Sequence, residues 1–141
     1  MKARAFAVSL TIAALAPASL LAGCGADNPA RPKLTLPAAD SFRAGACRDA
    51  ADPILALGRL TYDRAGRKTL PAGDYPFLVE QGEKLLAVRD RADATVQERM
   101  NDVLAAIGFV RIRTGKTYDP RLMNDLETAR AALQTECVRQ A

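Results

Sequence analysis

Residues 95–110 read TVQERMNDVLAAIGFV, and this stretch decides the fold class. Its apolar residues recur at alternating intervals of four and three, which places them on one face of an α-helix; they are Val96, Met100, Val103, Ile107 and Val110. Thr95 with Glu98 three residues later fits a capping box. The helix is therefore expected to begin near Asp93 or Thr95 and to end by Gly115.

Three other segments have the same periodicity. The first is expected from residue 40 or 41 to about 61, and the second from Asp74 to about Arg91, with a polar loop between them. Pro53 lies inside the first segment, where it either kinks one helix or begins a new one. The last opens with Asp119-Pro120, an N-cap and a first-turn proline, and its stripe comprises Leu122, Leu126, Ala129, Leu133 and Cys137.

The composition agrees with an all-helical domain. The chain is rich in Ala and Arg and contains no Trp and no His, and β-branched residues are few beyond residue 23, which favours helix over sheet. Four amphipathic helices joined by short loops predict a small up-down-up-down four-helix bundle. The helical domain is expected to span residues 41–141.

The N-terminal segment has the marks of a secretory signal. Lys2 and Arg4 precede an apolar stretch from Ala5 to Leu21, and small residues lead to Cys24. A transmembrane helix and an uncleaved signal are the alternatives, although Pro17 interrupts a stretch already short for a membrane span. Cleavage before Cys24 would make this residue the first of the mature chain and the attachment site of a diacylglyceride. Two or more acyl chains would hold the protein stably on a membrane.

Residues 24–40 are expected to form a flexible tether behind the lipidated cysteine. Three prolines, Pro29, Pro32 and Pro37, occur there without helical or strand periodicity. The expected organisation is a lipoprotein signal peptide over residues 1–23, a tether over 24–40 and the helical domain.

Two cysteines remain after Cys24, and an exported chain favours their pairing. Cys47 lies early in the first expected helix and Cys137 late in the last, so an up-down-up-down bundle brings both to one pole. Two buried free thiols are the alternative. A metal site is disfavoured because the chain has no His and no Cys-x-x-Cys motif.

The opposite pole is expected to be basic and aromatic. Helices end and begin there within residues 59–77 and 109–120, and the candidate interaction surface comprises Tyr62, Arg64, Arg67, Lys68, Tyr75, Arg111, Arg113, Lys116 and Tyr118. Because Tyr and Arg are enriched in binding hot spots, an anionic envelope polymer or an acidic protein is the expected partner. The alternative is that the cations complement helix C-termini and the tyrosines seal the bundle end. Phe77 and Phe109 are expected in the core.

No sequence motif points to catalysis. The chain lacks His, a glycine-rich phosphate loop and a Glu-x-x-His motif, and its carboxylates lie at polar helical positions. We therefore expect a non-enzymatic protein without a cofactor or a nucleic-acid partner. A carrier with an apolar pocket inside the bundle is the alternative, and the pocket would be lined by Leu85, Val103, Ile107 and Leu126. Small residues that could leave such a gap are Gly58, Gly82, Ala105 and Gly108.

The chain also resembles a known group of proteins. Leu21-Ala22-Gly23-Cys24 looks like a lipobox, and residues 42–48 read FRAGACR at the opening of the first expected helix. These features resemble the small Ala/Arg-rich secreted lipoproteins of high-GC Gram-positive (actinobacterial) bacteria. The resemblance implies lipidation at Cys24 and a location on the extracytoplasmic face of the cell membrane, and it implies no particular activity.

Overall fold

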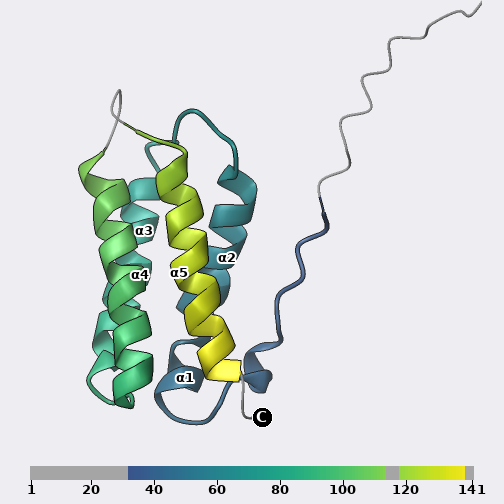
Figure 1. Ribbon diagram of the computed structural model, residues 1–141, viewed down its shortest axis with the longest axis vertical. Helices are drawn as coiled ribbons and strands as arrows, with labels where there is room; N and C mark the ends of the chain where they lie inside the picture. Colours follow the sequence, from purple (N-terminus) through teal and green to yellow (C-terminus); the bar gives the residue numbers. More distant parts are fainter. Residues whose placement is uncertain (1–31, 114–117, 139–141) are drawn as a thin grey trace, which may run out of the picture. The chain divides into compact units, whose positions relative to one another are not determined.

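The computed structural model describes residues 32–113 and 118–138, which are helical and contain no strand (Figure 1). The elements are η1 (Ala39–Ser41), α1 (Ala46–Asp49), α2 (Ala51–Arg64), α3 (Asp74–Arg89), α4 (Ala94–Ile112) and α5 (Arg121–Val138). The signal segment, Cys24, Gly115 and Lys116 lie outside the described residues.

Helices α2, α3, α4 and α5 form the predicted up-down-up-down bundle. Each of α2 and α4 packs against both α3 and α5, so α2 and α4 lie across the diagonal of the bundle. The loop between α2 and α3, the end of α4 and the start of α5 lie at one end of the bundle, and the turn between α3 and α4 lies at the other (Figure 1). The expectation of an all-α four-helix bundle is confirmed.

The first expected helix is interrupted rather than continuous. Separate helices α1 and α2 meet at Ala50, and Pro53 lies in the first turn of α2. A proline has no N–H to donate to the carbonyl of Asp49, and its ring would collide with that carbonyl in a continuous helix. The break between α1 and α2 therefore lies where Pro53 would have interrupted the backbone hydrogen bonds of a continuous helix.

The start of α4 is capped by a different residue from the one predicted. The Asp93 carboxylate accepts a hydrogen bond from the backbone N–H of Val96 at 3.0 Å, whereas Thr95 lies within the helix. The capping box of Thr95 and Glu98 is therefore wrong, although the helix begins where expected. At the other end α4 stops at Ile112, three residues before Gly115.

The buried residues confirm the predicted apolar stripe of α4, whereas the buried face of α5 differs from the predicted one. All five predicted core residues of α4 are buried. In α5 the buried positions are Met123, Leu126, Arg130, Leu133 and Cys137, while Leu122 and Ala129 are only partly buried. The face of α5 that meets the bundle is thus rotated by about one residue step, and it brings an arginine inward.

A disulfide joins Cys47 to Cys137, as predicted, and ties α1 to the end of α5. The two Cα atoms are 5.2 Å apart, and both side chains are buried. The backbone N–H of Arg43 also donates to the carbonyl of Cys137 at 2.9 Å, beside the buried ring of Phe42. These contacts fasten the beginning of the domain to its last helix at the pole opposite the α2–α3 loop (Figure 1).

The extended segment before η1 contacts the domain. Leu36 is partly buried against the core, beside Gly58 of α2. A Cβ atom at Gly58 would lie 3.0 Å from Leu36 Cδ2 and 3.3 Å from Arg130 Cζ, so the missing side chain leaves room for both. Part of the segment expected to act as a spacer therefore packs beside α2.

Candidate functional site

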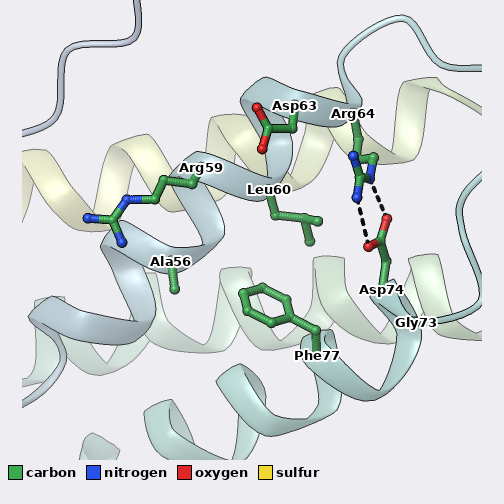
Figure 2. Close-up of a pocket in the computed structure, with 8 residues that line it drawn as sticks. All are labelled: Ala56, Arg59, Leu60, Asp63, Arg64, Gly73, Asp74 and Phe77. Atoms are coloured by element: carbon green, nitrogen blue, oxygen red, sulfur yellow. Dashed lines mark hydrogen bonds and ion pairs between the residues drawn. The ribbon is translucent and has the colours of Figure 1, made fainter.

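An open groove lies between α2 and α3, toward the pole remote from the disulfide (Figure 2). Its volume is about 360 Å³. We call it the α2–α3 groove, and it is lined by Ala56, Arg59, Leu60, Asp63, Arg64, Gly73, Asp74 and Phe77.

The groove has an apolar floor and a charged rim. Leu60 is buried and Phe77 half-buried, and their side chains lie near one another between the two helices (Figure 2). Arg59 and Asp63 are exposed one turn apart on α2. A ligand in the groove would therefore meet apolar surface below and both a cation, Arg59, and an anion, Asp63, at the rim.

Arg64 and Asp74 close the end of the groove as an ion pair. Arg64 Nε lies 2.5 Å from Asp74 Oδ2 and Arg64 Nη2 lies 3.1 Å from Asp74 Oδ1, a two-point contact between the end of α2 and the start of α3 (Figure 2). The hydrogen bond to Asp74 raises the pKa of Arg64. Because its donors are committed to a buried carboxylate, Arg64 has a structural role that the sequence did not reveal.

The predicted basic pole is divided between opposite corners of the bundle. Arg67 and Lys68 are exposed in the loop that follows α2, whereas Arg111 and Arg113 are exposed at the end of α4. Since α2 and α4 lie across the diagonal, these pairs of cations belong to different surfaces. Lys116, the remaining predicted cation, falls outside the residues described.

The three tyrosines differ in accessibility. Tyr62 and Tyr75 are half-buried, but Tyr118 is only 9% exposed and packs in the core cluster. Among the described residues the Tyr118 hydroxyl has no hydrogen-bond partner. Burial raises its pKa, and the nearby Tyr75 adds to the effect. Tyr118 therefore seals the bundle end, as the alternative interpretation of the sequence anticipated.

Asp119 caps α5, as the Asp119-Pro120 pair predicted. Its Oδ1 accepts from the backbone N–H of Arg121 at 2.9 Å, and its Oδ2 accepts from Arg121 Nη2 at 2.7 Å. These hydrogen bonds lower the pKa of Asp119. The pair lies at the same pole as the groove but on α5, and it serves the helix end.

A buried polar cluster between α2 and α5 was missed by the sequence analysis. The guanidinium of Arg130 donates to Glu127 at 2.8 and 2.5 Å and to Gln134 Oε1 at 2.5 Å. The hydroxyl of buried Thr61 also donates to Glu127. The signal was present, because Arg130 is in phase with Leu133 and Cys137 at intervals of three and seven.

The residues expected to line an apolar carrier site lie in the core and do not line the α2–α3 groove. Leu85, Val103, Ile107 and Leu126 are buried in the continuous core cluster. Of these four, Ile107 reaches a pocket of the described residues, a shallow one between α3 and α4. Phe77 is half-buried, and the expectation that Phe109 lies in the core is wrong, since it is 57% exposed.

The described part of the chain holds no group of three or more Cys, Asp or Glu side chains arranged to bind a metal ion. Within the same residues no helix is both long and apolar enough to cross a membrane. A scan against models of protein families, a search of curated proteins and a search of solved structures found no match to this chain.

Proposed function

We propose that this protein is a lipid-anchored, extracytoplasmic interaction module of the cell envelope, and that its α2–α3 groove binds an acidic segment of another protein without catalysing a reaction. The observation that carries the proposal is the position of exposed Arg59 beside the apolar floor formed by Leu60 and Phe77. Arginine is enriched in protein-binding hot spots, and both Arg and Phe are enriched at the cores of protein interfaces.

The groove favours a protein segment over an anionic polymer. A polymer of repeating anionic groups needs cations alone, whereas this groove also offers an apolar floor. An acidic segment with one apolar side chain uses both, with the side chain on Phe77 and a carboxylate on Arg59. The exposed cations Arg67 and Lys68 on the adjoining loop would steer such a segment toward the groove.

The membrane attachment rests on the N-terminal sequence. The charged start, the apolar stretch and the Leu21-Ala22-Gly23-Cys24 motif support cleavage before Cys24 and lipidation of its thiol. Changing Cys24→Ala is expected to leave the protein unprocessed or released from the membrane, as measured by fractionation and intact mass. An unchanged acylated mass with full membrane retention would refute lipidation at this residue.

The groove is tested by capture of cross-linked partners from envelope fractions. We expect wild type and Lys84→Glu, an exposed charge reversal further along α3, to capture the same partner, and Arg59→Glu to lose it. A partner that binds by charge alone would respond to Lys84→Glu as strongly as to Arg59→Glu. That result, or equal capture by Arg59→Glu and wild type, would refute groove binding.

A further inference from the structure

The outer face of α4 is exposed and unusually apolar for a helix on the surface of a bundle. Ile112 is 71% exposed and Phe109 is 57% exposed, and Ala105 is exposed one turn before Phe109. At Gly108, which lies between them, an added Cβ would have no described atom within 4 Å. Exposed apolar residues that adjoin one another on one face are candidates for an interaction site.

Charges at the two ends of this face have opposite signs. Asp102 is exposed on the N-terminal side of the apolar residues, and Arg113 is exposed on their C-terminal side. Asp102 also lines a surface pocket of about 250 Å³ between α4 and α5, where Asp125 adds a second carboxylate. The intramolecular partner of Asp102 is Arg99 at 3.2 Å, an exposed pair of the kind that contributes little and exchanges easily.

We propose that the outer face of α4 binds a second copy of this chain, with the two α4 helices packed antiparallel about a twofold axis near residue 107. An antiparallel arrangement brings the acidic end of one helix to the basic end of the other. Asp102 and Arg113 lie about equally far from the axis, roughly 8 Å along the helix on either side. The dimer therefore has two equivalent charge contacts, and each joins Asp102 of one copy to Arg113 of the other.

The apolar residues obey the same symmetry. Ala105 and Phe109 lie on opposite sides of residue 107, so the large ring of one copy meets the small side chain of the other. Gly108 lies next to the axis at the edge of this face, and a side chain added there would meet no described atom of its own chain within 4 Å. A surface complementary to itself in both charge and size is what an isologous dimer requires.

This interface is separate from the proposed partner groove. The groove lies between α2 and α3, whereas the face of α4 lies on the helix diagonal to α2. Arg111 and Arg113, which the sequence grouped with the groove cations, thus belong to the region of self-association. Because the two surfaces consist of different residues, a result that refutes binding at one surface does not bear on the other.

Cross-linking in intact membranes tests the geometry with the full chain. Gly108→Cys places two thiols beside the twofold axis, whereas Ala94→Cys is exposed on the same helix but roughly 40 Å from its mate in the dimer. Treated with a short bismaleimide, Gly108→Cys is expected to form a covalent dimer at a yield at least about tenfold above Ala94→Cys. Wild type sets the background for native thiols. Equal yields from the two positions, or no dimer from Gly108→Cys, would overturn the proposal.

Charge reversal tests the pairing within the Gly108→Cys background. Either Asp102→Arg or Arg113→Asp alone places like charges at both charge contacts of the dimer. Each single variant is expected to weaken dimerisation roughly 2- to 30-fold. The double variant restores opposite charges and is expected to recover the yield. If the double variant stays as weak as either single variant while its thermal unfolding is unchanged, Asp102 and Arg113 do not meet across the interface.

Discussion

Removing Glu127 is expected to destabilise the fold more than removing its partner Arg130. The pair is bidentate, but the Arg130 side chain is only 5% exposed while that of Glu127 is 43% exposed. Glu127→Ala leaves a guanidinium buried between α2 and α5 with Gln134 as its remaining side-chain acceptor. Arg130→Met leaves a carboxylate that water can hydrate, and the methionine refills most of the space beside Gly58.

The magnitudes follow from this asymmetry. Breaking a buried pair so that a charge stays uncompensated costs about 3–5 kcal/mol, and the lower end applies because Gln134 still accepts one hydrogen bond. Arg130→Met is expected to cost about 1 kcal/mol, the value of a half-exposed pair with little cavity. With a urea dependence of about 2 kcal/mol per molar, Glu127→Ala lowers the unfolding midpoint by roughly 1.5 M and Arg130→Met by roughly 0.5 M.

Urea titrations followed by circular dichroism at 222 nm measure both variants under identical conditions. Glu80→Ala removes one partner of the exposed pair with Lys84 and is the control, with an expected change below about 0.5 kcal/mol. The double variant of Glu127→Ala with Arg130→Met is expected to resemble Arg130→Met alone, because no buried charge remains. The reasoning fails if Arg130→Met is as costly as Glu127→Ala, or if the double variant shows the sum of both losses.

Two further predictions concern the disulfide and the bundle end. Cys47 and Cys137 close a loop over a sequence separation of 90. Replacing both by Ser is expected to lower the free energy of unfolding by about 4–5 kcal/mol in the chain-entropy model, as measured by urea unfolding. A wild-type protein whose stability is unchanged by a reductant would argue against this. Tyr118→Phe removes a buried hydroxyl without a described partner and is expected to stabilise the fold by about 1 kcal/mol. The pKa of Tyr118 is raised in the folded state, so folding favours its neutral form. The wild-type protein therefore keeps its full stability below about pH 10 and loses part of it as the pH rises further. The phenylalanine variant should lack that alkaline loss, so superimposable pH profiles for the two proteins would contradict the assignment.

The helices and their order were accessible from sequence because they depend on local patterns. The stripe of α4 needs only a spacing of three and four residues, and Asp119-Pro120 marks the start of α5 through backbone chemistry of neighbouring residues. The pairing of Cys47 with Cys137 followed from alternating helix directions, which bring the two ends of the domain to one pole. The break before α2 was one of two outcomes that Pro53 permits.

The candidate site was only partly accessible. The sequence placed Arg67 and Lys68 at the right pole but grouped them with Arg111 and Arg113, although the predicted topology puts the first and third helices of the bundle across its diagonal. The engagement of Arg64 with Asp74 was also hidden, since residues ten positions apart meet only when α2 and α3 are set side by side.

Local periodicity and chain direction were enough to predict four main helices, the alternation of their directions and the pairing of Cys47 with Cys137. The packing of the helices against one another determines which face of each helix points into the core. Arg130 enters the bundle because Gly58 leaves space for it, and Phe109 lies on a face of α4 that the described helices leave exposed. Periodicity defines a face only to within about one residue step, and the shape of the neighbouring helices selects the side chains that are buried.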